Sequence, residues 1–476
     1  MNEIAQEFNF LGYDLDGDTG RVLFRYQLLW DKPNAKRGKE LTFTETFLFG
    51  SGYDWDLTAR KLLDVLYFVA GVSYYKAGLP SRLNFKNMPV SSSEAALTAA
   101  VYSRGLEEMA YRNNLELPGL SFFDAAGAAV VSGSGESHPG AVLPNRPSPL
   151  ADPASEESIP EGGIKVLLPF GGGIDSLTSL ELLRHKADEI SLFVMSRLND
   201  RYAAIENAAE AAKLPVVRLE RQLDEKILDS VSLGLLNGHV PITAVISAAA
   251  VVSAHLNGFN HAVMSNEKSA SSGSVLGDKT VNHQWSKGIE FEAMLHAMVK
   301  DVTGGAISYF SLLRPLSELW IARRFVSCDT YLPVFRSCNR AFHIDPGQRL
   351  DKWCGVCDKC CFIDLILAPF LSKYQLEEIF AGAEPLSAEA NHDRFLALLG
   401  LYAKPFECVG DVTECRAALQ LALERDDRKG DGPAESLAAA AAAPGSPNLV
   451  TEREIEELMH PSGENFIPGY LRDVFL

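Results

Sequence analysis

Hydrophobic and polar residues alternate through the first fifty positions of the chain. The hydrophobic members of this pattern are Phe8 and Phe10, then Val22, Phe24 and Tyr26, then Phe43, Phe47 and Phe49. Turn-forming residues at 16–18 and 33–34 separate the alternating segments. A period of two is typical of strands that bury one face, so we predict a small antiparallel sheet. Helical patterns at 56–77 and 93–115 complete a predicted N-terminal α+β domain, residues 1–123.

A different pattern begins near residue 161, where short apolar runs alternate with amphipathic segments. The predicted strands are 165–170, 190–195, 215–219, 261–265 and 307–311, and the predicted helices between them include 176–186, 200–213 and 241–256. Repeated strand–helix units favour a doubly wound parallel sheet, and we assign residues 161–335 to this α/β domain. Ligands of such sheets bind outside the carboxyl ends of the strands.

Compositional bias marks two further segments. Residues 124–160 are rich in Ala, Gly, Ser and Pro, which predicts a flexible linker. Residues 425–449 contain Ala438–Ala443 and a Pro-Gly-Ser-Pro sequence, and we predict a disordered insertion there. Between these segments, after the α/β domain, 336–424 forms a predicted cysteine-rich helical region. The tail 450–476 contains one short predicted helix.

Charge and hydropathy restrict the partners of the chain. The net charge is −18 and no Lys/Arg-rich run is present, which disfavours nucleic acid as a partner. Residues 230–266 carry no Asp, Glu, Lys or Arg, but Pro241 and several polar residues interrupt them. We therefore predict a buried helix over 241–256 and no membrane partner. The N-terminus lacks the pattern of a signal peptide and the cysteines are clustered, so we expect a cytoplasmic protein.

The segment 165–176 contains the strongest chemical signal. An apolar strand leads into Gly171, Gly172 and Gly173, and Asp175 and Ser176 then open a helix. Glycines allow backbone N–H groups to surround an anion, and the helix N-terminus attracts the same charge. The Asp175 carboxylate suits Mg²⁺, which prefers oxygen ligands. We predict a site for the phosphates of ATP; the alternative is a strand-to-helix turn whose glycines serve packing alone.

Two later loops place polar groups at the edge of the predicted sheet that also carries the glycine loop, where the parallel strands have their carboxyl ends. Glu267 and Lys268 follow the strand that ends at 265, and His283 and Lys287 belong to a polar turn further on. The alternative for each loop is a solvated surface. Among the arginines between 314 and 349, we select Arg340 as a binder of substrate anions because it lies beside a cysteine cluster, whereas others are expected to form surface ion pairs.

Cysteines suggest a metal site and, separately, proton chemistry. Three closely spaced thiols and one upstream, which are Cys354, Cys357, Cys360 and Cys338, predict a structural zinc site. An iron–sulfur cluster and free buried thiols are the alternatives. Cys408 and Cys415 are either small buried hydrophobic residues or acid/base groups that move a carbon-bound proton, as cysteine pairs do in some amino-acid racemases.

The glycine loop resembles the Ser-Gly-Gly-x-Asp-Ser loop of the PP-loop ATP pyrophosphatases, with Gly171 in place of the first serine. A longer series of motifs is similar to the ATP-dependent UDP-N-acetylmuramoyl-L-alanyl-L-glutamate epimerases of bacterial cell-wall synthesis. The series is Pro-Phe-Gly-Gly-Gly-Ile-Asp-Ser, Ser-Asn-Glu-Lys-Ser-Ala-Ser, Val-Asn-His-Gln-x-Ser-Lys, Cys-Gly-x-Cys-x-Lys-Cys and Pro-Phe-Glu-Cys-Val-Gly. The resemblance spans most of residues 1–420.

This resemblance implies a PP-loop fold, ATP and Mg²⁺ as cofactors, and a UDP-linked muramoyl dipeptide as substrate. The L-glutamate carboxylate would be capped as an acyl-adenylate, so that loss of the Cα proton does not build a second negative charge beside the first. The implied roles fall into three groups. Gly171, Gly172, Gly173, Asp175 and Ser176 would hold ATP and Mg²⁺, Lys287 and Arg340 would hold substrate anions, and Glu267, Lys268, His283, Cys408 and Cys415 form the pool for acid/base work.

Three alternatives stay open on the sequence. A PP-loop ligase that forms an amide, a nitrile or a thiolated product would share the adenylate and differ in the attacking group. A non-catalytic nucleotide-binding module is the second alternative, with Gly171 as the mark of a decayed site. The third is that the C-terminal half is a structural zinc domain without a catalytic part.

Overall fold

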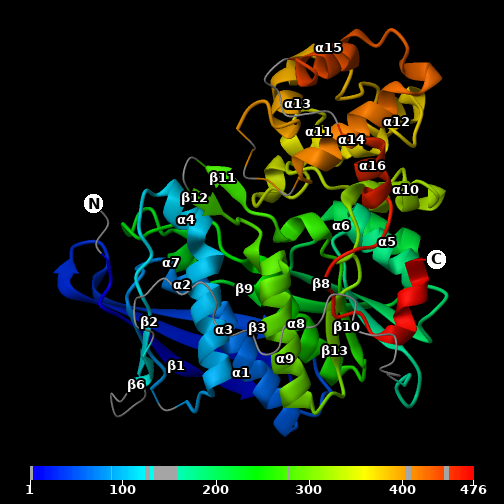
Figure 1. The fold of residues 1–476 in the computed structure, drawn as a ribbon. Helices are drawn as coiled ribbons and strands as arrows, with labels where there is room; N and C mark the ends of the chain where they lie inside the picture. Colours follow the sequence, from blue (N-terminus) through cyan, green and yellow to red (C-terminus); the bar gives the residue numbers. More distant parts are fainter. Residues whose placement is uncertain are drawn as a thin grey trace.

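A computed structural model describes residues 4–86, 88–123, 129–132, 158–276, 279–403, 405, 407, 409–443 and 450–475. Its described strands form an eleven-stranded sheet in the order β13-β10-β7-β8-β9-β3-β2-β1-β4-β5-β6 and a separate hairpin of β11 and β12 (Figure 1). The strands are β1 Glu7–Asp16, β2 Arg21–Asn34, β3 Gly38–Leu48, β4 Arg82–Asn84, β5 Ser121–Phe123, β6 Ala129–Ser132, β7 Lys165–Pro169, β8 Glu189–Arg197, β9 Val216–Gln222, β10 His261–Met264, β11 Ser274–Leu276, β12 Lys279–Val281 and β13 Ser308–Ser311.

Helices connect and cover these strands. They are α1 Leu57–Ala70, α2 Val72–Tyr75, α3 Ser92–Ser103, α4 Glu107–Arg112, α5 Ile174–Leu183, α6 Ala203–Ala212, α7 Glu225–Leu228, α8 Ile242–Leu256, α9 Ile289–Thr303, α10 Glu318–Phe325, α11 Asp358–Leu367, α12 Lys373–Ile379, α13 His392–Leu398, α14 Val412–Leu423, α15 Gly432–Ala441 and α16 Glu452–Leu458. Short 3₁₀ turns fill several of the connections. No helix in the described residues is long and apolar enough to cross a bilayer.

The parallel half of the sheet confirms the predicted strand–helix alternation. Strands β7, β8 and β9 follow one another in parallel, and β10 and β13 then add in parallel on the other side of β7. The direction of strand addition therefore reverses between β7 and its neighbour β10. Such a reversal opens a crevice at the carboxyl ends of the strands.

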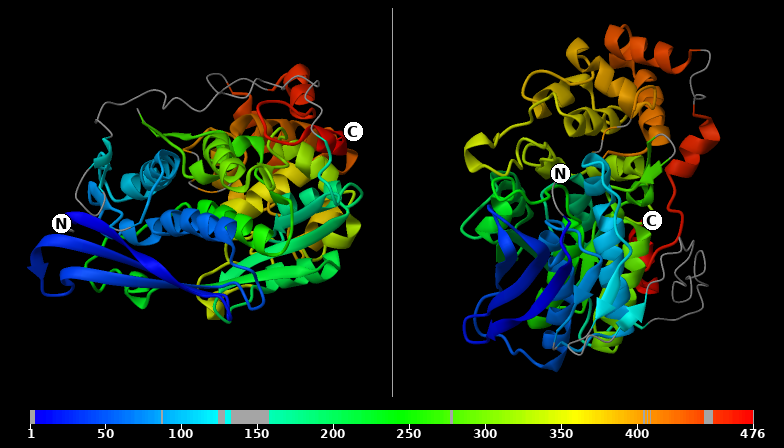
Figure 2. Two further views of the ribbon diagram at one scale, coloured as in Figure 1. Left: turned by 90° about the horizontal axis from the view of Figure 1, so that it is seen from below. Right: turned by 90° about the vertical axis from the view of Figure 1, so that its left-hand side faces the viewer.

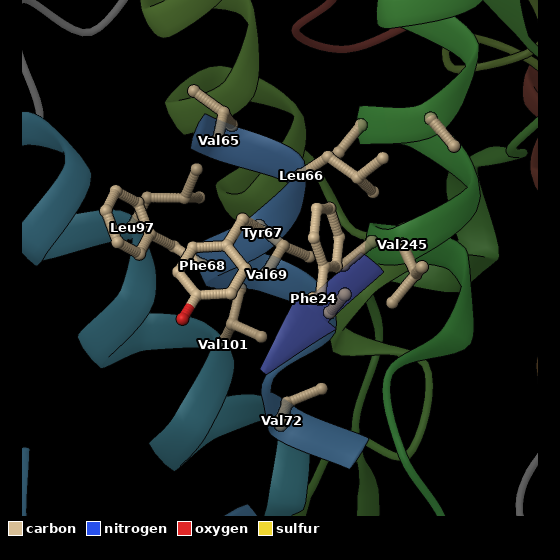
Figure 3. Packing of buried hydrophobic residues seen from close by; sticks show 14 of the residues in the cluster. Phe24, Val65, Leu66, Tyr67, Phe68, Val69, Val72, Leu97, Val101 and Val245 are labelled. Atoms are coloured by element: carbon tan, nitrogen blue, oxygen red, sulfur yellow. The ribbon is translucent and has the colours of Figure 1, made fainter. Parts of the chain in front are cut away.

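Both faces of this half are covered. Along β7, Leu167 packs into one hydrophobic cluster, whereas Val166 and Leu168 pack into another. Successive strand residues point to opposite faces, so the two clusters lie on the two sides of the sheet. The first contains α1, α3, α8 and α9, and Figure 3 shows Phe24 of β2 among side chains from α1, α3 and α8. The chain thus has the predicted α/β class, with a mostly parallel sheet.

The predicted N-terminal antiparallel strands are present, but they do not form a separate domain. Strand β3 pairs antiparallel with β9, so residues 1–123 and 161–335 share one sheet. A buried ion pair between Glu45 and Arg221 crosses this junction. Figure 2 shows the N-terminal strands (blue) at one end of the sheet and the parallel strands (green) at the other. The backbone groups at the edge of β3 are paired by β9, and this pairing removes the boundary that the sequence suggested.

The two compositionally biased segments differ from their predictions where the structure describes them. Within the predicted linker, β6 pairs with β5; residues 124–128 and 133–157 lie outside the described residues. Within the predicted disordered insertion, α15 is a helix that buries Ala434 and Leu437; residues 444–449 lie outside the described residues. The alanines that suggested low complexity are the strongest helix formers, and their helix buries one face.

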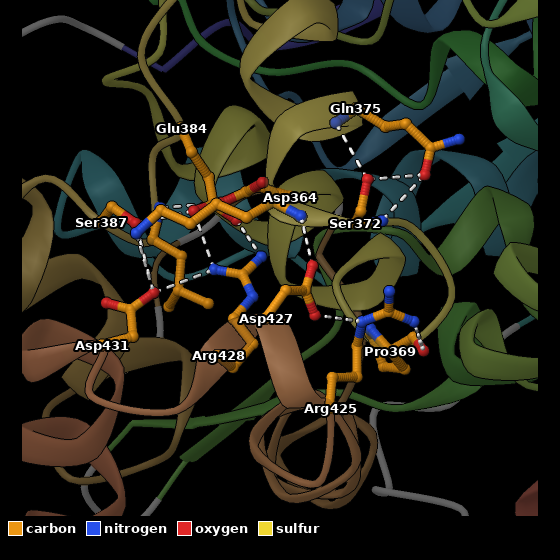
Figure 4. A network of polar contacts seen from close by, with 12 residues as sticks. Asp364, Pro369, Ser372, Gln375, Glu384, Ser387, Arg425, Asp427, Arg428 and Asp431 are labelled. Atoms are coloured by element: carbon orange, nitrogen blue, oxygen red, sulfur yellow. Dashed lines mark hydrogen bonds and ion pairs between the residues drawn. The ribbon is translucent and has the colours of Figure 1, made fainter.

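Helices α11 to α15 form a C-terminal lobe (residues 336–443) that stands beyond one end of the sheet (Figure 1). Polar contacts fix its last segment. The buried Arg428 guanidinium pairs with Glu384 and donates to Asp431 at 3.2 Å (Figure 4). The chain then returns to the body through α16 and a final 3₁₀ helix, where Tyr470 Oη lies 2.8 Å from His261 Nε2.

Candidate nucleotide-binding cleft

The glycine loop joins β7 to α5 and needs glycine at two positions. Gly172 has a φ of +70°, and a Cβ there would lie 2.7 Å from the carbonyl oxygen of Ala204. A Cβ at Gly173 would lie 2.8 Å from Ser337 Oγ. At Gly171 a Cβ would meet nothing within 4 Å, so this residue faces open space. The loop therefore packs closely on one side and exposes its backbone on the other.

The open side of the loop is part of a cleft of about 410 Å³. Its walls come from the ends of β7, β8 and β10 and from the segment 336–342. The lining residues are Pro169, Phe170, Gly171, Gly173, Asp175, Ser176, Phe193, Met195, Ile205, Thr243, Ile246, Met264, Ser265, Asn266, Lys287, Arg336, Ser337 and Phe342. The cleft thus occupies the crevice at the strand reversal, with most of the predicted loop residues and Lys287 on its surface.

Asp175 stands in the first turn of α5 and is poised for a cation. Its Oδ1 atom is buried and has no hydrogen-bond partner among the described residues. Burial, and then the neighbouring charge of Glu267, raise the pKa of Asp175 to about 6, while Lys359 and Lys287 oppose this rise. A carboxylate oxygen without a partner among the described residues, beside this cleft, fits the donor set that Mg²⁺ takes from proteins.

Three more buried carboxylates are linked to Asp175 through their charges: Glu267 and Glu318 interact with it directly, and Glu414 interacts with those two. Glu267 follows β10, whereas Glu318 and Glu414 stand in the first turns of α10 and α14. The Glu318 backbone N–H donates to Glu414 Oε1 at 3.1 Å. Burial, together with the charges of Asp175 and Glu267, raises the pKa of Glu318 well above its usual value. Burial, and then Asp411, raise the pKa of Glu414 to about 8.

Sequence reasoning selected Glu267 and missed Glu318 and Glu414. Both missed residues occupy the start of a helix, after the caps Ser317 and Asp411. Each local signal predicts a helix start and nothing else. Only the packing of α10 against α14 and α5 brings the two carboxylates together.

Arg314 connects two of the predicted loops. Its guanidinium is buried and pairs with Glu292 at 2.8 Å. It also donates to the carbonyl oxygens of Glu267, at 2.7 Å, and Lys287. One side chain therefore sets the relative position of two residues that are 20 positions apart in the sequence, on the same rim as the glycine loop.

Arg336, rather than the predicted Arg340, lies at the cleft. Arg336 lines it, and its backbone N–H donates to the Gly172 carbonyl at 3.1 Å. Its Nη1 donates to the carbonyl of Phe335 at 2.7 Å, and burial lowers the pKa of Arg336. Arg340 is exposed and is not among the residues that line the cleft. Spacing along an irregular segment did not distinguish these two arginines.

His283 belongs to a second cleft, of about 310 Å³. Its lining residues are Glu108, Arg112, His239, Ile242, Thr243, His283, Gln284, Ser286, Lys287 and Glu407. Thr243 and Lys287 line both clefts, so the two are adjacent. His283 Nε2 lies 2.9 Å from the Glu407 carbonyl oxygen. Cationic and imidazole groups therefore gather next to the nucleotide cleft.

Two of the remaining predicted acid/base residues, Lys268 and Cys415, are not among the residues that line the cleft. Lys268 is exposed, and its ammonium donates to Ser462 Oγ at 2.8 Å. Cys415 is fully buried within the hydrophobic cluster that includes the C-terminal lobe. Cys408 lies outside the described residues.

The four cysteines of the predicted metal site converge. The Sγ atoms of Cys338, Cys354, Cys357 and Cys360 all lie within 4.8 Å of one another. Gly355, within the Cys354–Cys357 turn, has a φ of +69°, a conformation that favours glycine. Four thiols at these distances match the donor set of a tetrahedral zinc site.

Comparison with known proteins identifies the family. Residues 1–312 match the model of the MurL N-terminal domain, and residues 334–450 match that of the MurL C-terminal domain. The chain belongs to the MurL family. A UDP-N-acetyl-alpha-D-muramoyl-L-alanyl-L-glutamate epimerase of Xanthomonas oryzae pv. oryzae is 36% identical over 98% of this chain and 95% of its own length. Proteins of the same name from a Micromonospora species and from Salinispora tropica are each 38% identical over 88% of this chain and over 87% and 85% of their own lengths.

The two MurL domains both contribute to the cleft and to the cluster of buried carboxylates linked to Asp175. The N-terminal domain supplies the glycine loop, Asp175, Glu267 and Lys287, and it ends just after β13. The C-terminal domain supplies Arg336 and Glu414 together with all four clustered cysteines. The site therefore requires the C-terminal MurL domain to be docked on the sheet.

Proposed function

We propose that this protein converts the terminal L-glutamate of UDP-MurNAc-L-Ala-L-Glu to D-glutamate, as a step in the synthesis of peptidoglycan precursors. In this proposal ATP activates the glutamate α-carboxylate as an acyl-adenylate and leaves as AMP and pyrophosphate, on a fold of PP-loop type. The names of the three relatives support the substrate and the epimerisation. The single structural observation that carries the ATP chemistry is the glycine-lined cleft, with buried Asp175, at the strand reversal.

The residues of the cleft suit a triphosphate. The backbone of Gly171 faces open space, and the N-terminus of α5 points its N–H groups to the same region. Arg336 and Lys287 supply positive charge on the cleft wall. Asp175 would hold Mg²⁺, which neutralises phosphate charge when it is bound. The phosphates of ATP thus meet donors and cations on several sides of the cleft.

Epimerisation then needs groups that remove and return the Cα proton on opposite faces. Buried carboxyl groups with raised pKa values suit this work, because proton transfer is most efficient when the pKa lies near the working pH. In this cluster the pKa of Glu414 is raised to about 8, and the charge of Glu267 acts on both Glu414 and Asp175. His283 stands in the adjacent cleft, on the far side of Lys287. We assign the proton transfer to groups drawn from these two positions.

The test is incubation with UDP-MurNAc-L-Ala-L-Glu, ATP and Mg²⁺ in D₂O, followed by AMP assay and chiral analysis of the glutamate. The proposal predicts AMP, D-glutamate and deuterium at Cα. AMP without isomerisation contradicts the epimerase and favours a ligase that lacks its nucleophile. If folded protein yields neither AMP nor D-glutamate, both proposed steps are refuted. Lys287→Met should lower activity, whereas Lys300→Met, at an exposed position on α9, is the matched control.

A further inference from the structure

We propose that Cys338, Cys354, Cys357 and Cys360 bind one zinc ion, and that this ion holds the Arg336–Ser337 wall of the nucleotide cleft against the glycine loop. The first part of this proposal, zinc binding, depends on the cysteine geometry alone. The second part, the positioning of the cleft wall, rests on the proposed function. The zinc is therefore a positioning element for ATP, although it makes no contact with the reacting atoms.

The sulfur positions fit a single ion. Cys357 Sγ lies 3.4 Å and Cys354 Sγ lies 3.6 Å from Cys360 Sγ. Four thiolates at about 2.3 Å from zinc stand about 3.8 Å apart in a regular tetrahedron. All pairs in the set lie within 4.8 Å, so four ligands surround one centre with little rearrangement.

The alternatives fit less well. A disulfide needs sulfur atoms about 2.05 Å apart, and the Cys354–Cys360 and Cys357–Cys360 pairs are far longer, at 3.6 Å and 3.4 Å. In a [4Fe–4S] cluster each thiolate binds its own iron, and in a [2Fe–2S] cluster two thiolates bind each of two irons, so either cluster spreads the four sulfurs more widely than one ion does. Buried free thiols do not need to converge, and Cys361, next to Cys360 and equally buried, stays outside the set.

The segment that carries Cys338 has no long helix or strand of its own. Between the end of α10 at Phe325 and the start of α11 at Asp358, the structure has only short 3₁₀ turns and irregular backbone. Irregular segments of this length are uncommon in compact domains unless something fixes them. A metal that joins Cys338 to the Cys354–Cys360 turn closes this segment at its middle and its end.

A short path leads from the cysteines to the cleft. Cys338 is two residues from Arg336, whose backbone N–H bonds the Gly172 carbonyl at 3.1 Å. Beside Cys354, the Trp353 ring packs edge-on against Phe335, with 5.2 Å between ring centres. The Arg336 guanidinium carbon lies 5.9 Å from the centre of the Trp353 ring. Loss of the ion would thus loosen the Arg336–Ser337 wall at Cys338 and at the Trp353–Phe335 contact.

The first experiment is metal analysis of the full chain, purified without chelator, followed by replacement of the metal with Co²⁺. We expect about one zinc per chain and, with Co²⁺, the intense visible bands of tetrahedral thiolate coordination. Cys354→Ser should lose the metal, and Cys361→Ser should keep it. If Cys354→Ser fails to fold, Cys354→His keeps a zinc ligand and should show a shifted Co²⁺ spectrum. Iron with inorganic sulfide, or no metal in wild-type protein that also takes up no Co²⁺, overturns the site.

The second experiment measures ATP binding by equilibrium dialysis, before and after removal of the metal. We expect the Kd for ATP to rise roughly tenfold, as a displaced binding wall predicts, and to recover when zinc is returned. An unchanged Kd in metal-free, folded protein refutes the positioning role and leaves the metal site standing. A chain that binds zinc but no ATP in either state refutes the proposed function instead, so the two failures are distinct.

Discussion

Replacement of Asp175 by asparagine should stabilise the ligand-free protein while it destroys ATP turnover. The pKa of this carboxyl rises from 3.8 to about 6 in the folded chain, chiefly because it is buried and secondly because Glu267 is near. Its ionised form is therefore less stable in the folded chain than in the unfolded chain. A shift of about 2 pKa units corresponds to about 3 kcal/mol at a pH above both values.

The sign of the pH dependence follows from the same shift. Well below the unfolded pKa of 3.8, the carboxyl is protonated in both states and does not affect the free energy of unfolding. As the pH rises from about 4 through about 6, the unfolded chain releases its proton first, so the free energy of unfolding decreases. The advantage of Asp175→Asn should thus be about 3 kcal/mol at pH 8 and about half of that at pH 5.

Urea unfolding at pH 5 and pH 8, followed by circular dichroism, measures this difference. Asp18→Asn, at an exposed turn position, is the control and should change the free energy of unfolding little at either pH. AMP release by Asp175→Asn should be lost, because an amide binds Mg²⁺ poorly compared with a carboxylate. A variant that is no more stable than wild type at pH 8, or whose gain is the same at pH 5, refutes the electrostatic account of this site.

Three further predictions concern the glycine loop, the buried ion pair of Arg428 and the hydrophobic core of Figure 3. Gly172→Ala should weaken ATP binding, seen as a raised KM, because φ is +70° and the added Cβ meets backbone at 2.7 Å. Arg428→Met should lower the free energy of unfolding by about 3–5 kcal/mol, because it leaves the buried Glu384 carboxylate unpaired, and the paired change Glu384→Gln should recover part of this loss. Leu66→Ala, fully buried in the core of Figure 3, should cost about 2–5 kcal/mol in urea unfolding, whereas Leu57→Ala, 70% exposed, should cost far less.

The sequence predicted the parts whose signal is local. The strand–glycine–helix segment at 165–176 and the buried helix α8 were expected from the hydrophobic period and from turn chemistry, and both are present. The pairing of β3 with β9 was not expected, because the edge of a strand carries no residue pattern that names its partner. Helix α15 was predicted as disorder, because an alanine run indicates both low complexity and helix, and only the packing of Leu437 decides between them.

At the candidate site the same limit applies over longer distances. The cysteine spacing was informative because three thiols lie within seven residues, and Cys338 joins them as expected. The role of Arg340 in holding substrate anions stays a prediction; Arg336, four residues earlier, is the one of these two arginines that lies against the glycine loop. Glu318 and Glu414 come from separate helices, so their meeting is a property of the lobe's docking.

Burial at this docked interface has consequences for both chemistry and stability. An acyl-adenylate reacts with water, so an epimerase that uses one needs the Cα proton to move before hydrolysis occurs. The docked C-terminal lobe brings Glu414 to Glu318 of α10, and burial raises the pKa values of both carboxyl groups and of Asp175. The exclusion of water that would protect an adenylate thus also raises the pKa values of these carboxyl groups. Groups with raised pKa values exchange protons more readily near neutral pH. The cost is a less stable ligand-free fold, which the Asp175→Asn experiment measures directly.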